Sequence, residues 1–215
     1  MKYPLIVFDW DGTVIDSPGA IVECIREASR DMGLRVPEPG QASHVIGLGL
    51  RDSLQLAVPD LPAERYQEFV ALYRKHFLQR EDCMPLFDGI HELLNDFSRK
   101  HTLAIATGKS RRGLDRALEA TGIGGLFMAS RCADETQPKP HPAMLLALME
   151  ELSMESTQVL MIGDTTHDLE MARAAGVDAV AVSYGAHPEQ ALREAAPLNC
   201  FSSVNSLFQW LQANA

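Results

Sequence analysis

Short apolar runs that alternate with helical patterns are the feature that most constrains the fold of this chain. Parallel strands are buried on both faces, so they are expected to be continuously apolar. The helices that connect such strands show an apolar stripe at i, i+3, i+4 and i+7. Five runs lie between or before such stripes, and we predict a strand at each of them: 5–8, 103–106, 126–129, 159–162 and the shorter 180–182.

The interval between the first two runs is much longer than the helix-plus-loop spacing between the later ones. Nearly a hundred residues separate them, with helical stripes from Ile21 to Met32 and from Tyr66 to Phe77 but no apolar run typical of a strand. We therefore predict the α/β class: a Rossmann-like parallel sheet with helices on both faces and an inserted helical cap. The predicted core is 1–15 with 86–215, and the predicted cap is 16–85.

Charge and hydropathy exclude several classes of partner. The chain carries 19 Lys and Arg against 29 Asp and Glu, a net charge of −10, and has no basic block. Nucleic acids and anionic membranes both require a basic surface, so neither is an expected partner. The apolar run near the N-terminus is too short for a signal peptide, and no segment approaches membrane-spanning length. We expect a cytoplasmic protein, either a monomer or a homodimer.

Polar residues follow the predicted strands at the points where ligands bind in open α/β sheets, beyond the carboxyl ends. One lysine stands in the loop before the fourth run. We expect these groups to converge on one edge of the sheet: Asp9, Asp11, Gly12, Thr107, Gly108, Lys139, Gly163, Asp164 and Asp168.

These residue types suit phosphoryl transfer. Carboxylates such as Asp9 and Asp164 are hard oxygen ligands for Mg²⁺, which offsets the repulsion between a carboxylate nucleophile and a phosphate. Asp11 stands two residues beyond Asp9, beside the Gly12 turn, and we expect it to take a different role from Asp9, that of general acid/base toward the leaving group. The backbone of Gly12 and Gly108 can approach a phosphate closely. We predict a Mg²⁺-dependent enzyme with a small phosphorylated metabolite as its partner.

Four motifs in order resemble the haloacid dehalogenase superfamily. They are Asp9-x-Asp11-Gly12-Thr13, Thr107-Gly108, Lys139-Pro140 and Gly163-Asp164-x-x-x-Asp168. The resemblance covers essentially the whole chain. Within the superfamily, the chain is similar to the phosphoglycolate phosphatase and β-phosphoglucomutase branch. It implies a phosphoric monoester hydrolase, because dehalogenase members lack the second aspartate of the first motif.

The resemblance also implies a role for each matching residue. Asp9 is expected to be the nucleophile that forms an aspartyl-phosphate, and Asp11 the acid/base. Thr107 and Lys139 are expected to hold the phosphoryl group, with Lys139 also contacting Asp9. The expected Mg²⁺ ligands are Asp9, the backbone carbonyl of Asp11, and Asp164. Asp168 is expected to support the metal through water or to orient Lys139.

Substrate choice is expected to come from the insert. Its segment Gly47-Leu48-Gly49-Leu50-Arg51 ends on a cation that can pair with a carboxylate of the substrate. The alternative is that Arg51 is an ordinary surface arginine at a helix start. Lys109 is interpreted as a cation near the site rather than a phosphate clamp, and His141 and His167 are assigned no chemistry.

Other functions are compatible with the same motifs. A phosphosugar mutase uses the same aspartyl-phosphate and returns the phosphoryl group to a sugar. An inorganic pyrophosphatase or a nucleotidase of the same fold is also possible. A non-catalytic binding module is less consistent with the sequence, because Asp9, Asp11, Lys139 and Asp164 are all present.

Overall fold

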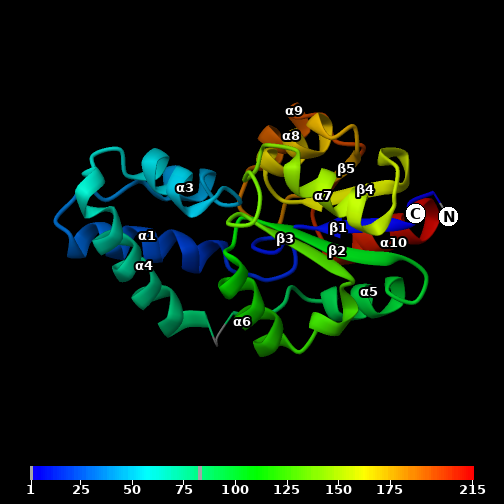
Figure 1. Ribbon diagram of the computed structural model, residues 1–215, viewed down its shortest axis with the longest axis horizontal. Coiled ribbons are helices and arrows are strands. Elements are labelled where there is room, and N and C mark those ends of the chain that lie inside the picture. The colour runs from blue at the N-terminus through cyan, green and yellow to red at the C-terminus, as the bar shows by residue number, and fades with distance from the viewer. Residues whose placement is uncertain (1, 82–83) are drawn as a thin grey trace.

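The computed structural model describes residues 2–81 and 84–215 and shows one six-stranded parallel sheet with helices around it (Figure 1). The strand order is β3-β2-β1-β4-β5-β6. The strands are β1 (Leu5–Phe8), β2 (Thr102–Thr107), β3 (Ala129–Cys132), β4 (Val159–Gly163), β5 (Asp178–Val182) and β6 (Cys200–Phe201). The helices are α1 (Pro18–Asp31), α2 (Pro39–His44), α3 (Leu50–Ala57), α4 (Tyr66–Glu81), α5 (Ile90–Phe97), α6 (Arg111–Thr121), α7 (Ala143–Leu152), α8 (Thr166–Ala174), α9 (Glu189–Glu194) and α10 (Val204–Asn214).

The central strand β1 shows why the predicted runs are continuously apolar. Leu5 and Val7 pack with apolar residues of α7 and α8 on one face of the sheet. Ile6 and Phe8 pack with residues of α5, α6 and α10 on the other face. All four side chains are fully buried, so neither face of this strand accommodates a polar residue. The predicted α/β fold with a parallel sheet and helices on both faces is confirmed.

The strand predicted at 126–129 is wrong in its position. Residues 124–126 form a 3-10 turn, and β3 runs from Ala129 to Cys132. This strand lies at the edge of the sheet, where one side has no neighbouring strand and full burial is not required. Its Ser and Arg residues therefore do not give the apolar signal of a central strand. The strand β6 at the opposite edge was not predicted, because its two residues, Cys200 and Phe201, are too short a run to give a strand signal.

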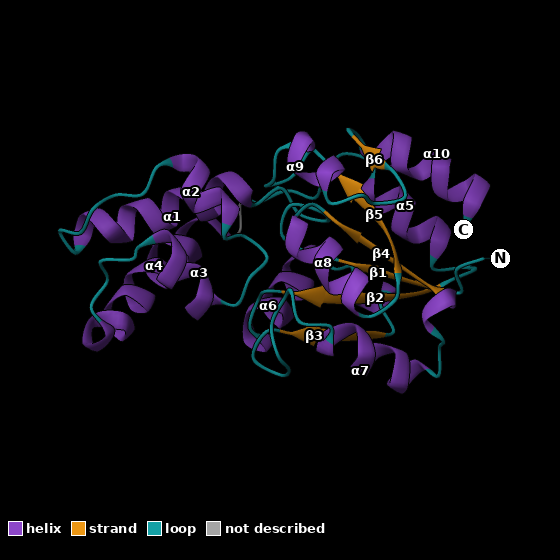
Figure 2. Cartoon of the chain, turned by 90° about the horizontal axis from the view of Figure 1, so that it is seen from above, coloured by secondary structure: helices purple, strands orange, loops and turns teal. Residues whose placement is uncertain are grey.

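Helices α1 to α4, called the helical insert below, form a separate layer with an apolar cluster of their own. They lie beyond the ends to which the strand arrows point (Figure 2). Ile15 bridges to Leu86 where the chain leaves and rejoins the sheet region, and the Asp16 N–H donates to the Pro85 carbonyl at 2.9 Å. Residues 82 and 83 of the predicted cap lie outside the described residues. Among the helices that are described, none is long and apolar enough to cross a membrane.

Candidate active site

Three of the predicted site residues lie at the carboxyl ends of three neighbouring strands. Asp9 directly follows β1, Thr107 is the last residue of β2, and Asp164 directly follows β4. Since β1 lies between β2 and β4, the three residues share one edge of the sheet. All three are buried. The sheet thus brings together residues from three distant motifs, as in other open α/β sheets.

Lys139 stands at the centre of a buried ion cluster. Its Nζ lies 2.6 Å from Asp9 Oδ1 and 2.6 Å from Asp168 Oδ1, and its side chain has no exposed surface. Burial alone lowers the pKa of Lys139, but Asp168 and Asp9 more than offset this and hold that pKa above its usual value. The contact between Lys139 and Asp168 is compatible with one of the two roles predicted for Asp168, that of orienting Lys139, and this role stays a prediction.

Two further carboxylate positions are fixed by short hydrogen bonds. Asp164 accepts from the Thr13 hydroxyl at 2.9 Å and from the Ala186 N–H at 2.7 Å. Asp168 accepts from both the N–H and the hydroxyl of Thr165, at 3.1 and 2.6 Å, in a capping box that opens α8. A polar cap of this kind satisfies free N–H groups at a helix start. It also fixes the orientation of the Asp168 side chain.

Gly12 allows the first and last motifs to meet. Its φ of +89° is a left-handed conformation, and an added Cβ would lie 2.1 Å from Asp164 Oδ2. Any side chain here would displace that carboxylate. The Gly12 N–H donates to the Ile15 carbonyl at 2.9 Å, within the turn that follows β1. The contact of Gly12 with a phosphate stays a prediction.

The buried acids fit a divalent cation. Ligand atoms of Asp9, Asp164 and Asp168 lie within 4.8 Å of one another. Burial, opposed by Lys139, raises the pKa of Asp9 to about 7, and burial together with Asp9 raises the pKa of Asp164 well above its usual value. One lysine does not balance three buried carboxylates. Carboxylate oxygens are ligands that Mg²⁺ takes, so these residues fit that ion.

Asp11 points away from this cluster. Its Oδ1 accepts from the Ser17 hydroxyl at 2.7 Å and lies 3.0 Å from Lys109 Nζ. The predicted division of the two aspartates into different environments therefore agrees with the geometry, while a metal contact through the Asp11 carbonyl stays a prediction. Ser17 was not predicted. Its one signal in the sequence is its place directly before Pro18, where a helix begins.

The helical insert lies directly over the end of β2. An added Cβ on Gly108 would stand 2.5 Å from the Gly47 carbonyl oxygen and 2.6 Å from that of Leu48. The Thr107 hydroxyl accepts from the Lys109 N–H at 3.2 Å and has no exposed surface. Gly108 therefore permits the loop between α2 and α3 to close against the core.

Arg51 is not brought together with the other predicted residues. It is the second residue of α3, it is exposed, and its guanidinium lies 5.9 Å from the ring centroid of Tyr66 within the insert. This position agrees with the alternative of a surface arginine at a helix start. Its role toward a substrate stays a prediction.

Three histidines form a second contact between insert and core. The carbonyl of His44, at the end of α2, accepts from His167 Nε2 at 2.9 Å and from His187 Nε2 at 3.0 Å. The three rings lie 5.0–5.5 Å apart. Burial is the main cause that lowers the pKa of both His167 and His187, the latter to about 4. His167 was assigned no chemistry from the sequence, and the structure places it at this contact.

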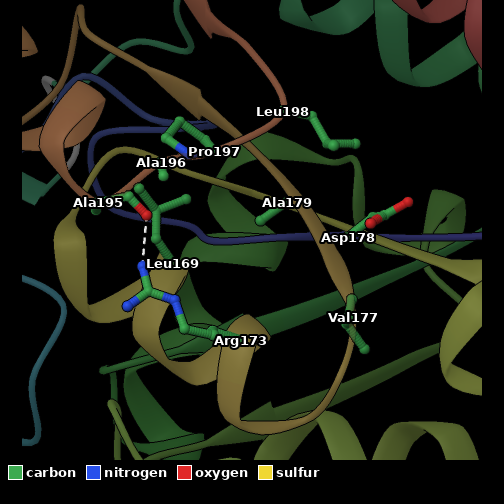
Figure 3. A pocket seen from close by; sticks show the side chains of 9 residues that line it. All are labelled: Leu169, Arg173, Val177, Asp178, Ala179, Ala195, Ala196, Pro197 and Leu198. Atoms are coloured by element: carbon green, nitrogen blue, oxygen red, sulfur yellow. Dashed lines mark hydrogen bonds between the residues drawn. The ribbon is translucent and has the colours of Figure 1, made fainter.

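A shallow hollow of about 150 Å³ lies elsewhere on the molecule, between α8, β5 and the segment after α9 (Figure 3). Arg173 donates to the Ala195 carbonyl across it. Its lining includes Asp178 at the start of β5, the end of the strand opposite to the catalytic edge. None of the predicted site residues lines it.

Comparison with known families agrees with this geometry. The family model described as "Haloacid dehalogenase-like hydrolase" matches residues 6–182, which include all four motifs. The chain belongs to the haloacid dehalogenase-like hydrolase family. The predicted family and the prediction of an enzyme of the hydrolase class are confirmed.

Several relatives are similar over most of this chain. "Probable phosphatase IndB" of Dickeya dadantii is 35% identical over 94% of this chain and 91% of its own. "Tyrosine-protein kinase PtkA" of Mycobacterium tuberculosis H37Rv is 33% identical over 84% of this chain. The matched region makes up only 62% of the length of that kinase. "Phosphoglycolate phosphatase" of Colwellia psychrerythraea is 27% identical over 94% of both chains.

Among solved structures, a predicted phosphoglycolate phosphatase from Haemophilus somnus 129PT has the same fold. It superposes with a TM-score of 0.89 over 99% of both chains, at 24% sequence identity. At this identity the likeness concerns the fold alone.

Proposed function

We propose that this hydrolase is a magnesium-dependent phosphatase that cleaves small-molecule phosphate monoesters through an aspartyl-phosphate on Asp9. The observation that carries the proposal is the state of the Asp9 carboxylate. Lys139 holds Oδ1 at 2.6 Å, whereas Oδ2 is buried and has no hydrogen-bond partner. One oxygen is thus fixed, and the other is available for attack on phosphorus.

The first half-reaction transfers the phosphoryl group to Asp9. As Asp9 Oδ2 bonds to phosphorus, the bond from phosphorus to the ester oxygen breaks, and Asp11 supplies the proton that the leaving oxygen needs. Lys139 and Thr107 stabilise the charge on the remaining phosphoryl oxygens. When bound at Asp9 and Asp164, Mg²⁺ supplies positive charge that offsets the repulsion between carboxylate and phosphate.

The second half-reaction restores the enzyme. Asp11, now a carboxylate, takes a proton from a water molecule as that water attacks phosphorus. The bond between phosphorus and the Asp9 oxygen breaks, inorganic phosphate leaves, and Asp9 is free again. The insert contacts Gly108 and two histidines of the core, and a site closed in this way keeps bulk water away from the covalent intermediate.

The substrate we propose is 2-phosphoglycolate, because two relatives at 27% and 29% identity carry the name phosphoglycolate phosphatase. Two others, at 30% and 29% identity, carry the name N-acetylmuramic acid 6-phosphate phosphatase. The close approach of the Gly47 and Leu48 carbonyls to Gly108 also favours a small leaving group. Residues 16–85 are proposed to act as the cap that selects it.

The nucleophile is tested with Asp9→Asn. We expect wild type with Mg²⁺ to release phosphate from 2-phosphoglycolate and from 4-nitrophenyl phosphate, and Asp9→Asn to release none. Asp88→Asn removes an exposed acid before α5 and serves as the matched control. Phosphate release by Asp9→Asn at the wild-type rate would refute the assignment.

The metal site is tested without turnover. Isothermal titration of Mg²⁺ into wild type should give one binding event, which Asp164→Asn should weaken at least tenfold. Equal affinity for the two proteins would contradict the proposed ligand set.

A further inference from the structure

Lys109 links the acid/base candidate Asp11 to the helical insert. Its Nζ lies 3.0 Å from Asp11 Oδ1 and 4.7 Å from the ring centroid of Phe77, and its side chain is only 11% exposed. Phe77 belongs to α4 of the insert, whereas Lys109 directly precedes Ser110, which caps α6 in the core. One ammonium group thus contacts residues of both layers.

Both contacts to Asp11 fall on the same oxygen. The Ser17 hydroxyl and Lys109 Nζ approach Oδ1 at 2.7 and 3.0 Å. Within the described part of the chain, no hydrogen bond to Oδ2 is found. Two donors on one oxygen restrict the rotation of the carboxyl group and so limit the positions that its second oxygen can take. This is the condition for a general acid that must reach a leaving oxygen within hydrogen-bond distance.

The Phe77 contact depends on the position of the insert. A cation over an aromatic face is stabilised by the ring, and more strongly when water is excluded. The residue before Lys109 is Gly108, against which the Gly47 and Leu48 carbonyls lie. The insert therefore covers this segment from two elements, α4 and the loop before α3. If the insert moves away, Lys109 loses the ring and gains water.

We propose that Lys109 is a positioning residue that directs Asp11 at the leaving group, and that Phe77 makes this arrangement depend on closure of the helical insert. The proposal rests on the proposed phosphatase function. It has a specific chemical consequence. When the released alcohol or phenol is a weak acid, its oxygen needs the proton of Asp11 to depart. When the released group is a stronger acid, it departs largely without that proton. Loss of Lys109 should therefore affect the two kinds of ester unequally.

The test compares phenyl phosphate with 4-nitrophenyl phosphate, whose leaving group is the stronger acid. The quantity measured is kcat/KM, which covers the steps up to departure of the leaving group. Lys109→Met should lower kcat/KM at least ~10-fold for phenyl phosphate and less than ~3-fold for 4-nitrophenyl phosphate, within the range of general acid effects. Lys109→Arg should restore most of the loss. Phe77→Leu should show the same inequality to a smaller degree.

Two further variants make the test sharper. Asp11→Asn should show the same inequality, and adding Lys109→Met to it should lower kcat/KM no further, because both act through one carboxylate. Lys100→Met removes an exposed lysine of the core and should leave both esters unaffected.

Two results would overturn the proposal. Equal losses on both esters in Lys109→Met, with wild type active, would remove the positioning role and leave the phosphatase function intact. A further loss when Lys109→Met is added to Asp11→Asn would show that Lys109 acts elsewhere. Wild type inactive on both esters would overturn the phosphatase function and, with it, this proposal.

Discussion

Gly108→Ala tests whether the loop between α2 and α3 closes the site. Alanine keeps the backbone N–H that was predicted to hold phosphate, and it adopts the Gly108 backbone conformation freely, since φ there is not positive. The added methyl would lie 2.5 Å from the Gly47 carbonyl oxygen. That oxygen must retreat by about 0.9 Å to reach ordinary contact at 3.4 Å.

The cost of this clash falls on the closed state. Gly108 directly follows β2, which pairs with β1 and β3, so the core cannot yield easily and the insert moves instead. Overpacking of this kind costs ~1–3 kcal/mol, which corresponds to a ~5- to 150-fold loss in kcat/KM if closure is needed for turnover. The free energy of unfolding should fall by no more than this cost, because opening relieves the clash without unfolding the chain.

The assay has two parts. One is kcat/KM for 2-phosphoglycolate with Mg²⁺. The other is amide hydrogen exchange across residues 43–49, where the Ile46 and Leu48 N–H groups donate to the Ser43 and Val45 carbonyls and should exchange faster in the variant. Gly125→Ala is the matched control, because an added Cβ there meets nothing within 4 Å. A folded Gly108→Ala protein with wild-type kcat/KM and unchanged exchange would refute the reasoning.

Three further predictions concern buried titratable groups in the metal-free protein. Lys139→Met should lower the free energy of unfolding by ~3–5 kcal/mol in urea titrations, because it leaves Asp9 and Asp168 without their buried partner. The stability of wild type relative to Asp9→Asn should fall as the pH rises from about 4 to about 7, since the raised pKa of Asp9 makes the native state hold a proton that the unfolded chain has lost. Relative to His187→Gln, stability should instead rise between about pH 4 and 6.5, since the lowered pKa of His187 keeps it neutral in the native state while the unfolded chain takes up a proton.

Each of these predictions has an opposite outcome that would contradict it. A loss below ~1 kcal/mol in Lys139→Met would mean that the two carboxylates are not held as a charged cluster with the lysine. Parallel pH profiles of wild type and Asp9→Asn would mean that Asp9 keeps its ordinary pKa in the metal-free protein. A stability difference against His187→Gln that falls with pH would mean that His187 is charged at its contact with His44.

The central strands and the motif residues were predictable from the sequence, and the edge strands were not. β1 and β4 are buried on both faces, so their apolar runs are continuous and their positions were predicted to within one residue. β3 carries Ser and Arg at an edge, where the sheet does not require a continuous apolar run, and the prediction there was displaced by three residues. The catalytic edge followed from the order of the strands, because polar residues directly after buried runs must meet there.

Contacts between the insert and the core were not predictable in the same way. The His44 carbonyl meets His167, and Lys109 meets Phe77, only once α2 and α4 are placed over the sheet. Nothing in the local pattern around Lys109 distinguishes a lysine paired with Asp11 from a lysine in solvent. Sequence spacing specifies the type of a helix or strand and the face that it buries. The contacts between insert and core depend instead on how the two layers pack against each other.

The two aspartates of the first motif show this difference within three residues. The described partners of Asp9 all come from the core: Lys139 on one oxygen, with Asp164 after β4 and Asp168 of α8 nearby. Asp11 is held from the core by Lys109 and by Ser17 at the start of the insert, and Phe77 of the insert covers Lys109. The contacts of the proposed nucleophile therefore come from the core alone, whereas those of the proposed acid are complete only when the insert is in place. A phosphatase arranged in this way would keep its nucleophile permanently ready and make proton transfer depend on closure over a substrate.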